Sequence, residues 1–419
     1  MAKRRINYKK MFLRLGCVVL IVLLFILLVS KLFKNNKKGS ANENSLKYKK
    51  GTCTVYYPKN REFKKYAEEI CSKTIDEQIY DYALIPYGDY YLVSYSDDTK
   101  FFMDKDNNPL VIDSLSNECR QVVSDYLRYQ AQSEENDEAY SIDFLERSYY
   151  RNIDLQDKKV SLNGVEVSVY LDEFDRTVTF PIFTIEKYLN INLGNNDYHY
   201  VRPHYVSSTR KNCILTFDDG PSIKNSTKII DELYHYGGSA TFFILGNRIN
   251  QEAVDLISDS ISKGNVYGSH TENNKNLITI EDDDEVYYEI MSPAEVLASG
   301  YEDDNLKIKG INYNMQFYRP PFGYRDSRID KISPLIAVKW DVDLEDWKYR
   351  DADHLYDRLM ELDANDEINN NLITIHDSYD DSAEGIVRAI RTLAEKGYQF
   401  ITVSEYFDLI DFDYNREYY

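Results

Sequence analysis

The sequence predicts an α/β protein whose carboxyl-terminal half is built on a parallel sheet or barrel, preceded by a transmembrane helix and a smaller α+β domain. Three observations support this prediction. Strand-like and helical runs alternate over roughly the last 200 residues, which is typical of βαβ units. A long apolar run with basic flanks lies near the amino terminus. Between the two, helices and strands follow one another without regular alternation, in a chain of 419 residues that is long enough for two or three domains.

The apolar run is interpreted as a membrane anchor. Leu15 to Ser30 carries no charge, and the run extended to residues 15–33 has membrane-spanning length. Six basic residues precede it and four follow closely, so residues 1–14 are expected in the cytoplasm and the bulk of the chain outside. A cleaved signal peptide is the alternative, but no small-x-small cleavage site follows the run. We therefore expect an uncleaved single-pass anchor, followed by a polar linker at residues 34–47.

Residues 48–200 are expected to form the α+β domain. Helical spacing covers residues 62–79 and 116–132, and Tyr90–Tyr95 has the composition of a strand. Residues 160–171 alternate between apolar and polar around Asn163-Gly164, a pattern typical of a β-hairpin. This region shows no convergent set of chemical groups, so we interpret it as an accessory domain for binding or spacing.

The part of the chain beyond the anchor is strongly acidic. The formal net charge is -20, and the first 38 residues contribute ten Lys or Arg and no acid, which leaves -30 for the remainder. Such a charge disfavours binding to a phosphate backbone, so no nucleic-acid partner is expected. It favours solubility and also suits a cationic polymer. The 38 tyrosines are interpreted as strand residues rather than as a surface for stacking on sugars.

Four of the five cysteines lie beyond the anchor, in a region where disulfides would persist, and Cys17 falls within it. A Cys53–Cys71 or a Cys71–Cys119 bridge is compatible with the sequence, which does not decide between them. Cys213 is expected to be a small buried apolar residue. No CxxC pair occurs, so a zinc–thiolate site is not expected.

Residues 205–412 carry the regular alternation. The predicted strands are Ile214–Phe217, Ala240–Leu245, Phe317-Tyr318, Ala337–Trp340, Leu372–Ile375 and Phe400–Val403. The predicted helices are Thr227–Tyr236, Ala253–Lys263 and Gly385–Lys396. This order predicts a parallel sheet with helices on its outside.

Two adjacent carboxylates, Asp218 and Asp219, end the first of these strands. Gly220-Pro221 follows at once and breaks the strand, and Ser222 can cap the next helix. The carboxyl ends of parallel strands are where α/β folds build their sites. Side chains alternate along a strand, so the two acids should point in different directions, one toward a metal and one free to take a proton. The alternative is a solvated turn, because Asp-Gly and Gly-Pro are common turn pairs.

Four further fragments follow in the same half of the chain. They are Gly268-Ser269-His270-Thr271-Glu272-Asn273-Asn274, Tyr318-Arg319-Pro320-Pro321-Phe322-Gly323, Trp340 to Trp347 with four acids, and Leu372-Ile373-Thr374-Ile375-His376-Asp377. His270 and Asn274 are four residues apart and would face the same way on a helix. An arginine at a strand end, such as Arg319, is a good partner for a carboxylate.

In this order and spacing, TFDDGPS, SHTENN, YRPPFG, WDVDLEDW and TIHDS resemble the motifs of the polysaccharide deacetylases, carbohydrate esterase family 4. The resemblance covers about half of the chain, far more than a single motif would. It implies a distorted (β/α) barrel with the site at the carboxyl ends of the strands. It also implies metal-assisted hydrolysis of N-acetyl groups on sugars.

The resemblance implies a role for each matching residue. Asp218 would be the general base and His376 the general acid, with Arg319 orienting the base and Asp346 holding the acid. Asp219, His270 and Asn274 would be the metal ligands. The backbone N–H of Phe322 would help to hold the oxyanion, and Trp347 would wall the slot for the acetyl methyl group.

Two positions depart from the family pattern. The second metal-binding histidine of the family falls at Asn274, and a neutral amide oxygen is usually a weaker ligand than imidazole. The residue two before the acid histidine, usually a leucine in the methyl pocket, is Thr374, which would make that pocket more polar. The base, the acid and the arginine are all retained.

The leading hypothesis is therefore a membrane-anchored enzyme, resembling peptidoglycan N-acetylglucosamine deacetylases, whose catalytic domain faces outward. It would use a divalent cation, Zn²⁺ with Co²⁺ or Mn²⁺ as alternatives, and its partners would be the cell-wall glycan and the membrane. Two alternatives remain. One is the same chemistry on a chitin-like polymer, poly-N-acetylglucosamine or acetylated xylan, and the other is a metal-poor pseudoenzyme that only binds glycan.

Overall fold

The computed structural model describes residues 45–73, 79–95, 99–134, 137–194, 200–303 and 306–412. The chain divides into two compact units, one up to Val111 with Asn163–Val165, and one from Ile112 that contains the rest. The predicted boundary between residues 200 and 205 therefore falls inside the second unit. No helix in the described ranges is long and apolar enough to cross a membrane, and the predicted anchor at 15–33 lies outside them.

The first unit consists of two small sheets and one helix. Their bounds are β1 (Ser45–Lys50), β2 (Cys53–Pro58), β3 (Ile79–Tyr80), β4 (Tyr82–Tyr87), β5 (Tyr90–Tyr95), β6 (Lys100–Asp104) and α2 (Lys64–Lys73). The sheets have the orders β1–β2–β3 and β4–β5–β6. The strand predicted at Tyr90–Tyr95 is confirmed. The helix predicted to reach residue 79 ends at Lys73 instead, because Ile79 and Tyr80 pair with β2.

A disulfide between Cys53 and Cys71 joins β2 to α2. The structure thus contains one of the two bridges that were compatible with the sequence. Cys119 and Cys213 are free and buried. Cys213 behaves as the small apolar residue that was expected, and it contributes to a hydrophobic cluster of the second unit.

The second unit begins with three helices and a three-stranded sheet. These are α3 (Arg120–Ser133), α4 (Ile142–Arg147), α5 (Glu186–Leu189), β7 (Val160–Asn163), β8 (Glu166–Leu171) and β9 (Arg176–Pro181). The hairpin predicted around Asn163-Gly164 is confirmed as β7 and β8, and Gly164 adopts the positive φ of 62° that its tight turn requires. The helix predicted at 116–132 is confirmed as α3.

Arg128 on α3 explains why the boundary lies before this segment. Its guanidinium is 3% exposed and donates to the carbonyls of Tyr234 (2.6 Å) and His235 (3.1 Å), at the end of helix α6 (Ile223–His235). A cation there is favourable, because the carbonyls at the carboxyl end of a helix carry partial negative charge. Nearby, buried Asp125 accepts a hydrogen bond from the Tyr234 hydroxyl at 2.6 Å. This polar network makes α3 part of the same folding unit as the barrel.

We expect Arg128→Ala to lower the stability of the chain by about 3 kcal/mol, because it removes a buried cation that is hydrogen-bonded to the carbonyls at the end of α6. The melting temperature, measured by circular dichroism on the detergent-solubilised chain, should fall by roughly 6–12 °C. Arg147→Ala, which removes an exposed ion pair with Asp143 on α4, is the control and should change little. Equal melting of the two variants would contradict this account.

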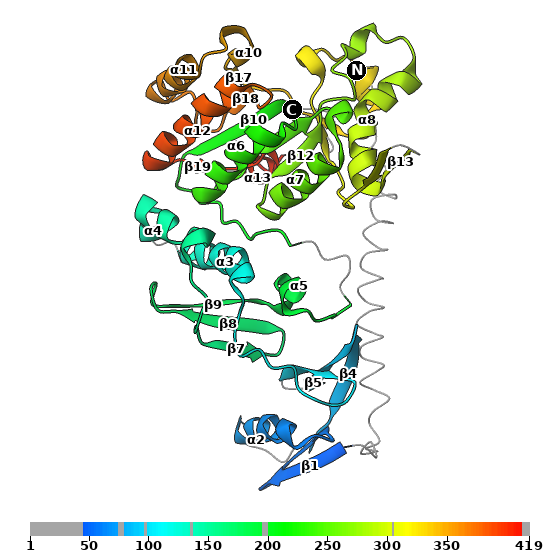
Figure 1. Cartoon of the computed structure of the whole chain (residues 1–419), viewed down its shortest axis with the longest axis vertical. Helices are drawn as coiled ribbons and strands as arrows, with labels where there is room; N and C mark the ends of the chain where they lie inside the picture. Colours follow the sequence, from blue (N-terminus) through cyan, green and yellow to red (C-terminus); the bar gives the residue numbers. More distant parts are fainter. Residues whose placement is uncertain are drawn as a thin grey trace, which may run out of the picture. The chain divides into compact units, whose positions relative to one another are not determined.

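The rest of the second unit is a parallel sheet with helices on its outside (Figure 1). Its strands are β10 (Asn212–Gly220), β11 (Thr241–Ile244), β12 (Val266–Ser269), β15 (Phe317–Tyr318), β16 (Ile336–Ala337), β17 (Val342–Asp343), β18 (Leu372–His376) and β19 (Gln399–Phe400). Its helices are α6, α7 (Gln251–Ser262), α8 (Asp283–Ser299), α9 (Ile329–Ile332), α10 (Asp346–Tyr349), α11 (Ala352–Ala364), α12 (Asp380–Glu395) and α13 (Val403–Leu409). The sheet order is β16-β15-β12-β11-β10-β18-β17, with β19 beside β10, and all pairs are parallel. This is the distorted, partly closed (β/α) barrel that was expected.

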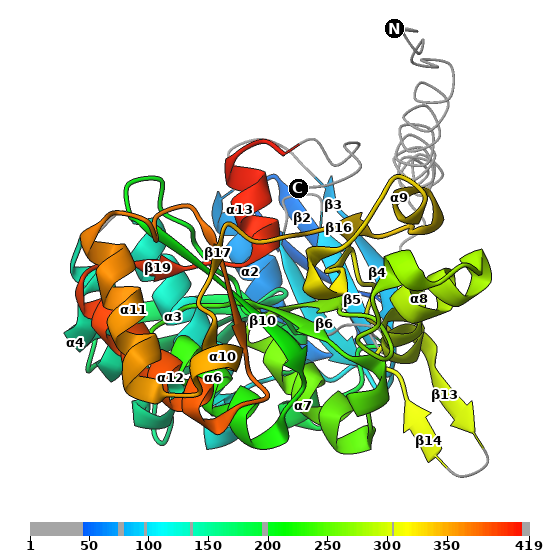
Figure 2. The same cartoon turned by 90° about the horizontal axis from the view of Figure 1, so that it is seen from above.

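The barrel differs in detail from the predicted elements. The strand expected at Ala337–Trp340 is the shorter β16, and the last strand ends at Phe400, because Thr402 caps α13. A hairpin of β13 (Gly300–Asp303) and β14 (Leu306–Lys309) was not foreseen, and it projects from the barrel (Figure 2).

Alternation along β10 and β18 separates the two faces of the sheet. Cys213, Leu215 and Phe217 pack in the cluster formed with α6, α7, α11 and α12. Ile214 instead packs in a second cluster with Leu372 and the residues of α13. Residues of even number on β10 therefore face the inside of the barrel, and this parity decides which side chains enter the site.

Candidate active site

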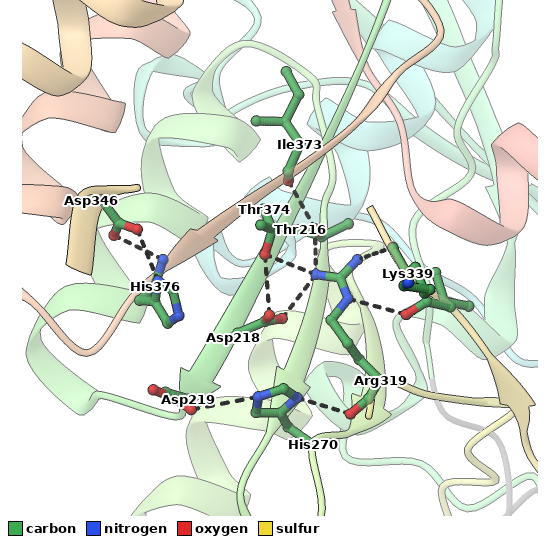
Figure 3. Close-up of polar contacts among 11 residues, drawn as sticks. Thr216, Asp218, Asp219, His270, Arg319, Lys339, Asp346, Ile373, Thr374 and His376 are labelled. Carbon is green, nitrogen blue, oxygen red and sulfur yellow. Dashed lines mark hydrogen bonds and ion pairs between the residues drawn. The ribbon is translucent and has the colours of Figure 1, made fainter. Parts of the chain in front are cut away.

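Asp218 and His376 lie side by side on the inner face of the barrel. The register pairs Ile214 with Leu372, Thr216 with Thr374 and Asp218 with His376. Because paired residues on neighbouring strands point the same way, both side chains enter the barrel at the carboxyl end of their strands (Figure 3). The structure therefore brings together the two residues that the sequence proposed as base and acid.

Asp219 reaches the site through a break in the strand. Simple alternation would turn it toward the outer helices. Instead the register shifts between Asp218 and Gly220, and Asp219 adopts a φ of 66°. Bulges of this kind re-aim side chains next to active sites. Asp219 consequently faces His270, with 3.6 Å between its Oδ1 and the Nε2 of the histidine.

Arg319 is the most deeply buried charge of the site. It follows β15, is 0% exposed, and stacks over the ring of Phe243 at 4.2 Å. Its Nη1 donates to Asp218 Oδ1 at 2.9 Å, and its Nη2 donates to the carbonyl of Lys339 at 2.8 Å. These contacts fix the guanidinium and, through it, the orientation of the Asp218 carboxylate.

The charges around Asp218 keep it ionised. Burial alone would raise the pKa of Asp218, but the nearby charge of Arg319, together with that of His376, outweighs burial and lowers the pKa below its ordinary value. At neutral pH the group is therefore a carboxylate that can accept a proton.

His376, in contrast, is held in its protonated state. Its Nδ1 donates to Asp346 Oδ1 at 2.8 Å, and its backbone N–H donates to Asp346 Oδ2 at 3.0 Å. Burial disfavours the imidazolium, but the hydrogen bond and the charge of Asp346 outweigh it and raise the pKa of His376 to about 9. Ser382 also donates to Asp346, which fixes the carboxylate. At neutral pH His376 is a charged acid with its Nε2 proton available.

His270 and Asn274 complete a corner with Asp219. The Nδ1 of His270 lies 3.0 Å from the carbonyl of Arg319, so the ring proton sits on Nδ1 and the Nε2 lone pair faces Asp219. Burial lowers the pKa of His270, which keeps the ring neutral. Asn274, with a φ of 55°, places its amide 3.1 Å from Asp219 Oδ1. The structure therefore gathers the three residues that the sequence proposed as ligands.

The donor set of this corner suits a divalent cation. A carboxylate and a neutral, tautomer-fixed imidazole are ordinary ligands, and an Asn amide supplies an oxygen once it is turned so that Oδ1 faces inward. No group of three His, Cys, Asp or Glu side chains within the described ranges could hold a metal ion. The corner thus depends on Asn274 for its third ligand.

Thr374 has a different position from the one the sequence suggested. Its hydroxyl donates to Asp218 Oδ2 at 3.1 Å and accepts from Arg319 Nη1 at 3.1 Å. Thr216, its register partner, also accepts from that nitrogen, at 2.7 Å. The predicted effect on a methyl pocket stays a prediction, and the structure adds a direct contact between Thr374 and Asp218. Both threonines have the inner parity of their strands, which is the signal that would have found them.

Phe322 and Trp347 lie at the rim. Phe322 is 61% exposed with a φ of 60°, and Trp347 is 50% exposed on α10 directly after Asp346. Both are thus available to a ligand from solvent, Phe322 in the turn after Arg319 and Trp347 on α10.

Comparisons with known proteins place the second half of the chain in a family. Residues 206–337 match the family model described as polysaccharide deacetylase. The solved structure of the peptidoglycan deacetylase PdaC from Bacillus subtilis is 31% identical in sequence over 49% of this chain and 94% of that chain, with a TM-score of 0.44. The chain belongs to the polysaccharide deacetylase family. The resemblance carried by the five motifs is confirmed, and with it the assignment to a family of hydrolases.

Two curated relatives show the extent of the match. Peptidoglycan-N-acetylmuramic acid deacetylase PdaC of Bacillus subtilis is 34% identical over 48% of this chain. Peptidoglycan-N-acetylglucosamine deacetylase PgdA of Listeria monocytogenes is 29% identical, also over 48% of this chain. The chain spans 39% of the length of each.

Proposed function

We propose that this chain removes N-acetyl groups from an extracellular polysaccharide and leaves free amines. The observation that carries the proposal is the pairing of Asp218 and His376 on adjacent strands in opposite protonation states. A carboxylate next to a charged acid is what hydrolysis of an amide needs, because one group must take a proton and the other must give one.

The residues of the site divide the reaction between them. Asp218 takes a proton from the attacking water, whose oxygen bonds to the acetyl carbon. Each oxygen of Asp218 accepts one hydrogen bond, from Arg319 or Thr374, and keeps a lone pair for this proton. His376 gives its Nε2 proton to the sugar nitrogen as the carbon–nitrogen bond breaks. Acetate and a free amine leave, and the proton on Asp218 returns the site to its starting state by exchange with His376 or solvent.

Asp219, His270 and Asn274 would hold a divalent cation, for which we propose Zn²⁺, with Co²⁺ and Mn²⁺ as alternatives. When bound, such an ion supplies positive charge that polarises the acetyl carbonyl and favours ionisation of water. We further propose that the N–H of Phe322 donates to the oxygen that becomes negative, and that Trp347 contacts the acetyl methyl group.

Peptidoglycan N-acetylglucosamine is the substrate that we propose. The names of the two relatives support peptidoglycan but divide between N-acetylglucosamine and N-acetylmuramic acid. To test the choice, the chain is incubated with peptidoglycan, chitooligosaccharides and poly-N-acetylglucosamine, and mass spectrometry locates each new free amine. Amines on N-acetylmuramic acid alone would overturn the choice of sugar, and activity on the other two polymers alone would overturn the choice of peptidoglycan.

We also propose that residues 15–33 anchor the chain in the cell membrane with the catalytic domain outside. The Cys53–Cys71 disulfide supports this placement, because disulfides persist in oxidising compartments. Protease treatment of intact cells should cleave the catalytic domain from the surface. A domain protected until the cells are lysed would contradict the proposed orientation.

A glycan-binding pseudoenzyme is the second candidate, and the dependence of the metal corner on Asn274 favours it. The variant Asn274→His distinguishes the two candidate functions. For an active enzyme, imidazole in place of the amide should strengthen Co²⁺ binding and change the turnover number modestly. For a pseudoenzyme, the unmodified chain would release no acetate and the variant would gain the activity. Calorimetric Co²⁺ titration beside an acetate assay measures both.

A further inference from the structure

Glu289 is a fully buried carboxylate that the proposed reaction does not use. It lies on the inner side of α8, within the barrel unit, and is 0% exposed. A buried carboxylate is unfavourable unless hydrogen-bond donors surround it. All the side-chain donors that reach Glu289 come from one loop, the segment between β12 and α8 that carries Asn274.

Three donors from this loop converge on the Glu289 carboxylate. The backbone N–H of Asn273 donates to Oε2 at 2.9 Å, and the Asn273 side-chain Nδ2 donates to Oε1 at 3.0 Å. Lys275 Nζ lies 2.9 Å from Oε1. Glu289 therefore binds the residues on both sides of Asn274, Asn273 through hydrogen bonds and Lys275 through an ion pair, but does not contact Asn274 itself.

A second contact between α8 and the same loop acts at Glu272. The backbone N–H of Glu272 donates to the carbonyl of Glu289 at 2.8 Å, and Ser292 Oγ donates to Glu272 Oε2 at 2.7 Å. On the other side, a Cβ added at Gly246 would lie 1.8 Å from Glu272 Oε2. The loop is thus packed between η6 (Gly246–Arg248) and α8 without spare room.

The backbone of the loop explains why it needs this support. Thr271 and Asn274 have φ values of 70° and 55°, in the left-handed region that side chains other than glycine rarely adopt. Within the loop, the backbone N–H of Asn274 donates to Thr271 Oγ1 at 3.1 Å. Such strained residues persist only where their surroundings hold them.

We propose that Glu289 is a positioning residue that holds the loop so that Asn274 faces Asp219 and His270 before a cation binds. The role for a cation rests on the proposed function, whereas the contacts by which Glu289 holds the loop do not. A site whose third ligand is a neutral amide benefits most from this arrangement, because none of the binding energy is then spent on ordering the loop.

Glu289→Gln tests the proposal with little change of volume. The amide keeps one acceptor oxygen and loses the charge and the second acceptor, so it cannot satisfy all three donors. Glu285→Gln is the matched control, because Glu285 lies on the same helix and pairs with Lys275 at 2.9 Å, but is about half exposed. If Glu289→Gln does not fold, Asn273→Ala removes one of the same bonds from the loop side.

The first readout is hydrogen–deuterium exchange of residues 271–275 in the metal-free full chain. We expect exchange about tenfold faster in Glu289→Gln and unchanged exchange in Glu285→Gln, with α6 and α12 unaffected in both. Exchange in Glu289→Gln equal to that of the unmodified chain would overturn the proposal. A general loosening of the barrel in this variant and in Asn273→Ala would overturn it as well, since the role would then be one of stability alone.

The second readout is Co²⁺ affinity, followed by calorimetry and by the visible absorption of the bound ion. We expect a loss of about tenfold in Glu289→Gln and no loss in Glu285→Gln, which is the usual size for an outer partner of a metal ligand. Unchanged affinity in a loosened loop would overturn the link to the metal. If the unmodified chain binds no Co²⁺, both the proposed metal site and the link between Glu289 and metal affinity are overturned. The exchange data would still test whether Glu289 holds the loop.

Discussion

Replacing Asp218 with Asn should lower the turnover number for acetate release by about 10³-fold or more, within the range that general bases contribute. The variant keeps the shape of the side chain and both the threonine and the arginine neighbour, but it replaces the carboxylate with a neutral amide that is too weak a base to take a proton from water. Binding of Co²⁺ should persist, because Asp219, His270 and Asn274 are unchanged. Acetate assays and Co²⁺ titration of the same preparation separate these two effects.

Asp366→Asn is the control for this substitution, because Asp366 is exposed and paired only with Lys211 on the surface. It should leave turnover and Co²⁺ binding as they are. Turnover in Asp218→Asn within tenfold of the unmodified chain would remove Asp218 from the role of base. A joint loss of turnover and Co²⁺ binding would point to Asp218 as a ligand instead.

The turnover number should fall as pH rises through about 9, because His376 must carry its proton to act and its pKa is raised to about 9. Below that pH the acid is charged, and above it each further pH unit lowers the active fraction about tenfold. Asp346→Asn removes the partner that raises this pKa and leaves burial to lower it. The alkaline limb should therefore move down by two units or more, with a loss of at least about tenfold at pH 8.

The measurement is a profile of turnover number against pH from 6 to 10.5, at saturating substrate. His354→Ala is the control, since His354 stacks on Tyr349 away from Asp346 and should leave the limb in place. An Asp346→Asn profile that keeps its limb near pH 9 would show that another group titrates there.

Much of the site could be predicted because strand ends and parity are visible in the sequence. Asp218 and His376 each end an apolar run, and in a parallel sheet such ends meet at one edge. The direction of Asp219 could not be predicted correctly from alternation alone, because the bulge before Gly220 re-aims it. The contact of Thr374 with Asp218 depends on the register of β10 against β18, which is set by packing of the whole barrel.

The division of the chain was harder to predict than the site. Composition changes near residue 205, and there the sequence suggested a boundary. The structure keeps residues 112–134, 137–162 and 166–194 in the barrel unit, and buried Arg128 donates to carbonyls at the end of α6. A lone arginine in a helical pattern does not reveal such a partner more than 100 residues away in the chain. The contacts of Glu289 could not be predicted for the same reason.

The central claim is hydrolysis of N-acetyl groups by Asp218 and His376, and release of acetate tests it most directly. The detergent-solubilised chain is incubated with peptidoglycan in Zn²⁺, Co²⁺ or Mn²⁺ at pH 7.5, and acetate and new free amines are counted together. We predict one amine for each acetate, with both lost in Asp218→Asn. No acetate with any of the three metals, or acetate that persists unchanged in Asp218→Asn, would contradict the account.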